Sequence, residues 1–299
     1  MAYRKFLAEL LFDGYRFRQN DEVLITDSNG KVEAILPSSE AGDDIQPLPG
    51  ILSPGFVNCH CHLELSHMKG LIEEHTGLTD FVYRVVTERH LPEEEVLEAI
   101  RNADEKMWRS GISAVGDICN NGLTIPQKSI SSIRYHNFIE ASGFLPSLAA
   151  SRFARSVEIF DQFADRFDRN SIVPHAPYSV SPELWRMIMD AGDGRLMTIH
   201  NQETPAEDEL FRQRSGDFLY LYKKLGVDPT FFLPTGLSSL QTCLPLFRSN
   251  QPLLLVHNVF TSAEDLSFVQ RQQRNQPVYW CFCPGANLYI TDRLPEINL

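Results

Sequence analysis

Short apolar runs alternate with longer stretches of mixed polarity from about residue 50 to the end of the chain. Each run has the length of a β-strand, and none approaches the roughly 20 apolar residues that a membrane-spanning helix needs. Strands that alternate with helices predict a parallel sheet with helices outside it. The apolar runs cover residues 51–58, 111–118, 130–140, 171–175, 195–200, 252–257 and 277–283. Seven such strands in succession favour a (β/α) barrel over an open sheet.

Three of the intervening stretches carry the signals of helix ends. Pro92 precedes a run of glutamates, and Gly111 follows the last residue of that stretch. Ser181 and Pro182 form an N-cap and first-turn pair, and Ser262 starts a third stretch. Serine at the cap, proline at the first position and acidic residues in the first turn all favour a helix start. We predict helices over residues 92–109, 181–191 and 262–273.

The first 50 residues have a different pattern, with short strands and frequent turn residues. Residues 22–26 and 31–36 are two apolar strands joined by a segment that contains Asn29 and Gly30, which predicts a β-hairpin. Further along, Pro47 and the pair Pro49-Gly50 are typical of turns.

Residues able to do chemistry cluster at the ends of the predicted strands. In a barrel these carboxyl ends converge on one mouth, where active sites form. His60 and His62 are two residues apart on one strand, so both imidazoles point to the same side and Cys61 points away. Two imidazoles on one side suit zinc or iron(II). Other strands end in Asp117, Glu140, His175, His200 and His257.

The composition narrows the function classes. Hydrophobic residues make up 43% and charged residues 22%, which is ordinary globular usage. With 27 Lys and Arg against 39 Asp and Glu the net charge is −12, which disfavours nucleic-acid binding. Charged residues interrupt the apolar start, so we expect no signal peptide, no membrane association and a cytoplasmic location. Six cysteines without a Cys-x-x-Cys pair predict free thiols rather than a disulfide scaffold.

Five segments of the chain stand out as motifs. They are Ser53-Pro-Gly-Phe-Val-Asn-Cys-His-Cys-His-Leu-Glu-Leu-Ser66, Val173-Pro-His-Ala-Pro-Tyr-Ser179, Thr198-Ile-His-Asn-Gln-Glu203, Leu255-Val-His-Asn258 and Cys283-Pro-Gly-Ala-Asn287. In this order they resemble metal-dependent amidohydrolases of the cytosine deaminase and chlorohydrolase branch, which includes guanine, S-adenosylhomocysteine and aminofutalosine deaminases. The resemblance implies a (β/α)8 TIM-type barrel over residues 52–299 and, over residues 1–51, the N-terminal part of a composite β-sandwich.

The same resemblance implies site roles. It makes His60, His62 and His200 the ligands of one divalent metal ion, zinc or iron. Glu203 matches the carboxylate that moves protons between the attacking water and a ring nitrogen of the substrate. His257 matches the histidine that hydrogen-bonds this water or the developing tetrahedral centre.

Two further residues are expected to contact the substrate. His175 stands where binuclear relatives have a carboxylated lysine, which implies a single metal and leaves His175 for the substrate or for packing at the barrel mouth. Glu64 lies in the His-Leu-Glu-Leu-Ser segment that resembles the aminofutalosine subgroup, and it either lines the substrate pocket or makes a local hydrogen bond.

The chain departs from the family after the seventh strand. Relatives continue to an eighth strand whose aspartate binds the metal, and that strand is missing here. Asp292 follows the seventh strand closely and reads as a loop residue rather than a replacement. We therefore expect a fragment of a longer enzyme or a truncated product with poor activity. Free sheet edges at the gap favour association, for example into a homodimer.

The expected function is the hydrolysis of a carbon–nitrogen bond outside peptides. The leading reaction is deamination of an aminated, purine-type heterocycle by metal-activated water, with that small molecule as the partner. One alternative is dechlorination of a triazine-like ring. The other is a non-catalytic remnant that keeps the fold and binds a ligand.

Overall fold

The structure is a computed structural model that describes residues 3–192, 194–272 and 274–298. The chain divides into two compact units, Met1–Phe56 and Val57–Leu299.

The first unit is a four-stranded mixed sheet with the strand order β3-β2-β1-β4. The predicted hairpin is confirmed, because β2 and β3 pair antiparallel. Gly30 lies in the turn with a φ of 84°, a backbone conformation that costs glycine little. Val23, Ile25 and Ala41 form the small core of this unit. The strands are β1 (Arg4–Leu11), β2 (Glu22–Thr26), β3 (Val32–Pro37) and β4 (Ile45–Leu52).

The predicted turn at residues 47–50 is wrong, since β4 runs through it and pairs parallel with β1. Proline lacks the N–H that an interior strand needs, but β4 lies at the edge of its sheet, where Pro47 and Pro49 are tolerated. Ile51 and Leu52 therefore belong to β4. The strand predicted over residues 51–58 begins only at Phe56, after the break at Pro54 and Gly55.

The second unit contains two parallel sheets, with the orders β5-β6-β7-β8 and β11-β10-β9. A hydrogen bond from the His200 N–H to the His175 carbonyl oxygen (3.0 Å) joins the end of β8 to β9. The predicted parallel α/β architecture is therefore confirmed. The strands are β5 (Phe56–Cys61), β6 (Ile112–Cys119), β7 (Arg134–Ala141), β8 (Asn170–Pro174), β9 (Met197–Asn201), β10 (Leu253–His257) and β11 (Val278–Cys281).

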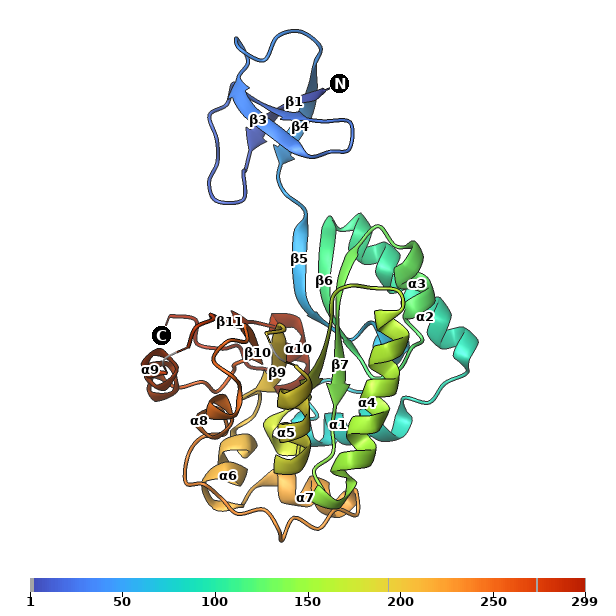
Figure 1. The fold of residues 1–299 in the computed structure, drawn as a ribbon, viewed down its shortest axis with the longest axis vertical. Helices are drawn as coiled ribbons and strands as arrows, with labels where there is room; N and C mark the ends of the chain where they lie inside the picture. The colour runs from blue at the N-terminus through green and yellow to red at the C-terminus, as the bar shows by residue number, and fades with distance from the viewer. Residues whose placement is uncertain (1–2, 193, 273, 299) are drawn as a thin grey trace. The chain divides into compact units, whose positions relative to one another are not determined.

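Helices follow most of these strands, and Figure 1 shows α2 beside β6 and α4 beside β7. The α-helices are α1 (Leu78–Glu88), α2 (Glu93–Arg109), α3 (Ile125–Ile130), α4 (Ala149–Ala164), α5 (Pro182–Ala191), α6 (Pro205–Gln213), α7 (Asp217–Lys224), α8 (Ser239–Cys243), α9 (Ala263–Arg271) and α10 (Pro284–Thr291). Short 3-10 helices are η1 (Leu63–Met68), η2 (Pro146–Leu148), η3 (Pro177–Ser179) and η4 (Leu244–Leu246).

All three predicted helices are present as α2, α5 and α9. The Ser181 and Ser262 hydroxyls accept hydrogen bonds from the first turns of α5 and α9, as N-caps do. Residue 273, the predicted end of the third helix, lies outside the described residues. The strand predicted from residue 130 begins only at Arg134, because residues 125–130 form α3 and Ile130 is 80% exposed at its end.

Most of the second unit's core is one apolar cluster. Strands β8, β9 and β10 are buried along their whole length, which is typical of parallel strands covered on both faces. A smaller cluster around Leu63, Val96 and Ile100 packs α2 against the neighbouring strands. The six cysteines form no disulfide, as expected. None of the helices in the described residues has the length and apolar character to span a membrane.

Candidate metal centre and active-site pocket

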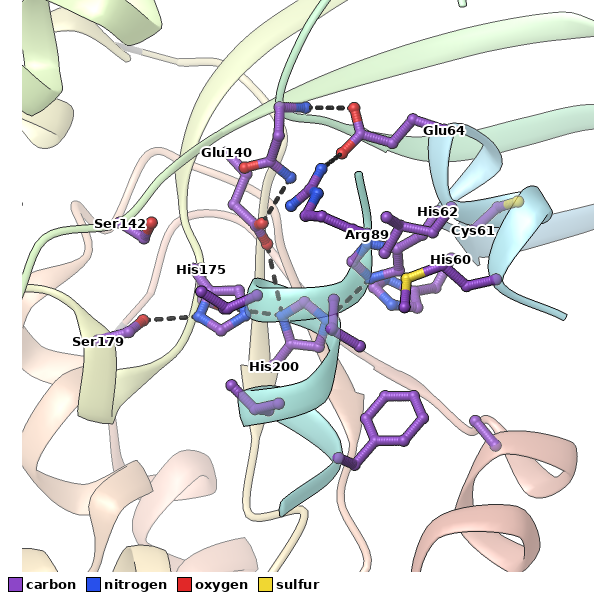
Figure 2. A pocket seen from close by; sticks show the side chains of 18 of the residues that line it. His60, Cys61, His62, Glu64, Arg89, Glu140, Ser142, His175, Ser179 and His200 are labelled. Atoms are coloured by element: carbon purple, nitrogen blue, oxygen red, sulfur yellow. Dashed lines mark hydrogen bonds and ion pairs between the residues drawn. The ribbon is translucent and has the colours of Figure 1, made fainter. Parts of the chain in front are cut away.

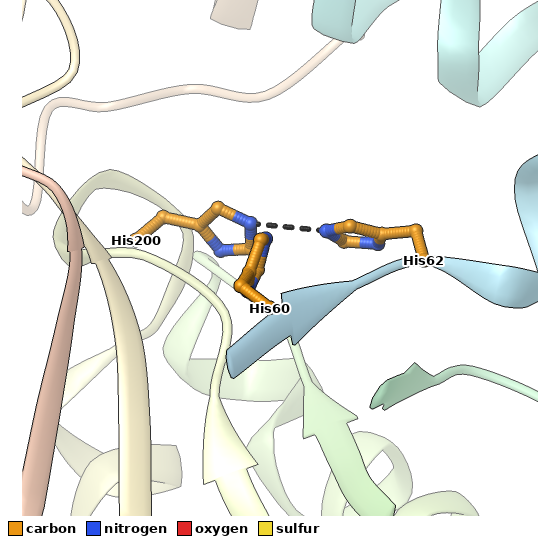
Figure 3. A group of neighbouring side chains, drawn as sticks. All are labelled: His60, His62 and His200. Carbon is orange, nitrogen blue, oxygen red and sulfur yellow. Dashed lines mark hydrogen bonds between the residues drawn. The ribbon is translucent and has the colours of Figure 1, made fainter. Parts of the chain in front are cut away.

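Three histidines from distant parts of the chain meet at the carboxyl ends of β5 and β9. His60 lies on β5, His62 one residue beyond it, and His200 on β9. Figure 3 shows the three rings facing one another. One ring nitrogen from each lies within 4.8 Å of the others. The Nε2 atoms of His62 and His200 are 3.2 Å apart.

This geometry fits a shared cation. Two nitrogens bound to one tetrahedral zinc at about 2.0–2.1 Å lie about 3.3 Å apart. His200 donates its Nδ1 proton to the His175 carbonyl oxygen (2.8 Å), which leaves the Nε2 lone pair facing His62. The Nδ1 atoms of His60 and His62 are buried and have no hydrogen-bond partner among the described residues. Three neutral imidazoles are a donor set that suits zinc and iron(II).

Burial keeps these rings neutral. It lowers the pKa of His200 to about 3, with a further contribution from His175. Burial, followed by the neighbouring histidines, also places the pKa of His60 and His62 well below its ordinary value. A neutral imidazole has a lone pair to give to a cation, so the electrostatics and the geometry agree.

Glu203 and His257 lie next to this histidine cluster. The ring centroid of His257 is 5.5 Å from that of His200, and its Nδ1 is 3.5 Å from a Glu203 carboxylate oxygen. His257 Nδ1 also lies 2.7 Å from Asn287 Oδ1. Because this oxygen only accepts, His257 carries its proton on Nδ1 and leaves Nε2 as an acceptor. Burial lowers the pKa of His257 to about 4 and raises that of Glu203 to about 8.

His175 lies beside the three histidines. Its ring centroid is 4.8 Å from that of His200, and its Nδ1 is 2.6 Å from the Ser179 hydroxyl. The buried Glu140 carboxylate lies 3.7 Å from His200 Nδ1 on the same side. One of its oxygens has no hydrogen-bond partner among the described residues.

Glu64 is buried in the wall of the pocket, and both of its carboxylate oxygens are engaged. One accepts from Arg89 (2.7 Å), and the other accepts from the Asn120 N–H (2.9 Å). The Asn120 side chain in turn donates to Glu140 (3.0 Å). Figure 2 shows this chain of contacts from Arg89 to His200.

A buried ion pair supports the segment that carries His62. Asp117, at the end of β6, accepts the Leu63 N–H (2.8 Å) and lies 2.6 Å from Lys128 Nζ. Both side chains are fully buried. Leu63 directly follows His62, so this pair fixes the backbone at a candidate metal ligand.

The histidines of the metal centre line one pocket of about 1730 Å³. All seven residues predicted for the site lie on its wall. They are His60, His62, Glu64, His175, His200, Glu203 and His257.

Several groups that complete the site were not predicted. Asn287 ends the Cys283–Asn287 segment, and its amide oxygen accepts the Nδ1 proton of His257. Asp117 and Glu140 were noted only as strand-end residues. Arg89 gives no signal in the sequence, because it lies in the connection directly after α1.

The fold and the histidine cluster define a parallel α/β protein with a candidate metal centre at its strand ends. The pattern of the Amidohydrolase family matches residues 51–298, and the chain belongs to this family.

The individual proteins that the chain resembles have low sequence identity to it. An adenosine deaminase of Helicobacter pylori is 24% identical over 253 residues, which cover 83% of this chain and 60% of the relative. The structure of the Helicobacter pylori aminofutalosine deaminase in complex with methylthio-coformycin superposes with a TM-score of 0.83 at 21% identity, over 99% of this chain and 73% of that one. Atrazine chlorohydrolase from Arthrobacter aurescens, complexed with zinc, gives a TM-score of 0.66 at 16% identity over 95% and 66%. Such likenesses show the fold.

Proposed function

We propose that this chain carries the active site of a metal-dependent hydrolase that removes ammonia from an aminated, purine-type heterocycle. The observation that carries the proposal is the convergence of His60, His62 and His200, with Glu203 and His257 beside them. The chain spans 60% of the length of the adenosine deaminase relative, so the activity is proposed for the protein to which this site belongs.

In this proposal His60, His62 and His200 hold one divalent cation, zinc or iron. When bound, the cation supplies hydroxide near neutral pH by lowering the pKa of water. His200 donates its Nδ1 proton in a hydrogen bond to the His175 carbonyl oxygen, and this bond orients Nε2 toward the cation position.

Glu203 acts as the proton carrier. Deamination forms a carbon–oxygen bond at an amidine carbon and breaks the bond to its amino group, which leaves as ammonia. Glu203 takes a proton from the attacking water and delivers it to the adjacent ring nitrogen, and the second proton of that water passes to the amino group, which leaves as ammonia. A pKa of about 8 suits this role, because the carboxyl group both accepts and releases protons near neutral pH. His257 accepts a hydrogen bond from the water through Nε2.

The substrate contacts are assigned to His175 and Glu64, which line the same pocket. His175 is neutral, because burial lowers its pKa to about 4, and it offers a hydrogen-bonding ring beside His200. Glu64 uses its remaining lone pairs toward the substrate while Arg89 holds its carboxylate in place.

The finer fold assignment is also part of this proposal. Strands β5 to β11 follow one another as the first seven strands of a (β/α)8 barrel, a reading supported by the superposition on the aminofutalosine deaminase. In the described residues β5 and β11 are the terminal strands of their sheets, and a homodimer is one way to cover such edges. We also propose a cytoplasmic location, in keeping with the free thiols.

The test is a screen of the zinc-loaded chain for ammonia release from adenosine-type, guanine-type and cytosine-type compounds. We expect turnover of a purine-type compound, and the Glu203→Gln variant serves as the matched control. Release of chloride from a chlorotriazine without ammonia from any amine would favour the chlorohydrolase alternative. A chain that binds methylthio-coformycin but turns over none of these compounds would be a ligand-binding remnant.

A further inference from the structure

Glu207, on the first turn of α6, is a buried carboxyl group with no role in the mechanism above. Its side chain is completely inaccessible. One of its oxygens accepts the Glu203 N–H (2.7 Å), and the other accepts the Gln202 N–H (3.1 Å). Within the described residues no basic side chain forms an ion pair with it. The carboxyl group is therefore used entirely on the two successive backbone donors that lead into Glu203.

This arrangement differs from ordinary helix capping. Thr204 is the N-cap of α6 and Glu207 is its third residue, the position from which a capping-box glutamate reaches back to the N-cap N–H. Here the carboxylate passes the cap and bonds to the two residues before it. Stabilisation of the helix alone does not require contacts at Gln202 and Glu203.

The backbone at Gln202 needs such support. Its φ is 43°, in the left-handed region that non-glycine residues rarely occupy without surrounding constraints. Its carbonyl oxygen accepts from the Phe260 N–H (3.0 Å), and its side chain bonds to Asp265 (3.0 Å) and Thr261 (2.8 Å). Glu207 accepts the N–H of the same residue, so the N–H, the carbonyl oxygen and the side chain of Gln202 all have hydrogen-bond partners.

We propose that Glu207 is a positioning residue for the reaction. It anchors the Gln202–Glu203 backbone in its strained turn and thereby aims the Glu203 carboxylate at the histidine cluster. This inference rests on the proposed function for the role of Glu203, whereas the anchoring itself is a property of the chain. Burial and the proximity of Glu203 raise the pKa of Glu207 to about 8, while the N–H groups of Glu203 and Gln202 act to lower it.

The experiment compares Glu207→Gln with Glu209→Gln, the same substitution at an exposed position on the same helix. The glutamine has nearly the shape of glutamate but turns one acceptor into an NH2 donor that faces an N–H. Hydrogen exchange of the Gln202 and Glu203 amides is followed by NMR in the full chain, together with bound zinc, kcat and KM on the best purine-type substrate. The Glu203→Gln variant is measured with and without Glu207→Gln.

We expect the two amides to exchange at least tenfold faster in Glu207→Gln and within twofold of the parent in Glu209→Gln. Zinc content stays unchanged, kcat falls at least tenfold, and KM stays within threefold. In the Glu203→Gln background, Glu207→Gln lowers kcat by less than twofold, because its effect acts through Glu203.

Unchanged amide exchange would overturn the proposal whatever the activity. Faster exchange with an unchanged kcat would overturn the positioning role. So would a further tenfold loss of kcat when Glu207→Gln is added to the Glu203→Gln variant. An unsubstituted chain without any turnover would contradict the proposed function instead, and the exchange rates would still decide whether Glu207 anchors this turn.

Discussion

The two walls of the pocket hold their functional residues by different electrostatic means. On the β5–β6 wall, the segment after His62 is fixed by Asp117, which is paired with the buried cation Lys128. On the β9 wall, the segment that carries Glu203 is fixed by Glu207, a carboxyl group that forms no ion pair with a basic side chain among the described residues.

The difference decides which groups hold protons. Burial alone would lower the pKa of Lys128, but Asp117 at 2.6 Å raises it, so the ammonium stays charged. Among the described residues, neither Glu203 nor Glu207 forms an ion pair with a lysine or arginine, and burial raises the pKa of each to about 8. The β5–β6 wall is therefore supported by a buried ion pair, whereas the β9 wall carries carboxyl groups that exchange protons near neutral pH, as an acid–base group must.

The largest expected effect comes from removing the proton carrier. Glu203→Gln keeps the shape of the side chain but cannot take up a proton, so we expect kcat to fall by about 10²–10⁴-fold, the usual contribution of general acid–base catalysis. Bound zinc should stay at the parent level. Steady-state kinetics with metal analysis checks both, and a variant that retains more than a third of kcat would show that another group moves the proton.

Breaking the Lys128–Asp117 ion pair of the β5–β6 wall should have the largest effect on stability. Lys128→Met leaves Asp117 buried without its partner, which we expect to cost about 3–5 kcal/mol of unfolding free energy. Lys106→Met, at an exposed position of α2, is the control and should change the free energy of unfolding by less than about 0.5 kcal/mol. Urea denaturation measures both variants. A loss below about 1 kcal/mol for Lys128→Met would contradict the view of this wall as an ionised support.

The third expected effect is a dependence of stability on pH. Glu203 and Glu207 keep their protons up to about pH 8 in the folded chain, whereas in the unfolded chain they lose them near the ordinary value of 4.5. The folded state therefore binds more protons between these values, and stability falls as pH rises through this window.

Each carboxyl group contributes up to about 1.4 kcal/mol per pH unit to this slope. Urea denaturation of the metal-free chain at pH 5, 6 and 7 should show a shallower slope for Glu207→Gln than for Glu209→Gln. Equal slopes in the two variants would mean that Glu207 is ionised in the folded chain.

The sequence was informative wherever chemistry and strand ends coincide. The spacing of His60 and His62 and the strand-end position of His200 predicted that these residues lie at one mouth, because parallel strands present their carboxyl ends on one side. The family resemblance then singled out the three histidines as metal ligands. Glu207 and Lys128 were not predictable in the same way. Both lie on helices, and their roles depend on which backbone donor or carboxylate the packed helix happens to reach.

Strand boundaries failed for a related reason. Pro47 and Pro49 indicate a turn by local rules, but an edge strand tolerates both, and edge position is set by the pairing of β4 with β1. Ile130 continues an apolar run in the sequence, yet it lies exposed at the end of α3. The local sequence pattern shows neither the edge position of β4 nor the exposure of Ile130, because both depend on how the elements pack together.

Metal binding is the most direct test of the central claim that His60, His62 and His200 form one cation site. The chain is stripped with a chelator, loaded with zinc and dialysed, and bound metal is counted against protein for the parent, His62→Asn, His200→Asn and the control His136→Asn, a histidine of β7 that bonds to Ser171. We predict one tightly bound ion for the parent and the control, and at least a hundredfold weaker binding for the other two variants. Equal zinc affinity in all four proteins, or no stoichiometric metal in the parent, would contradict it.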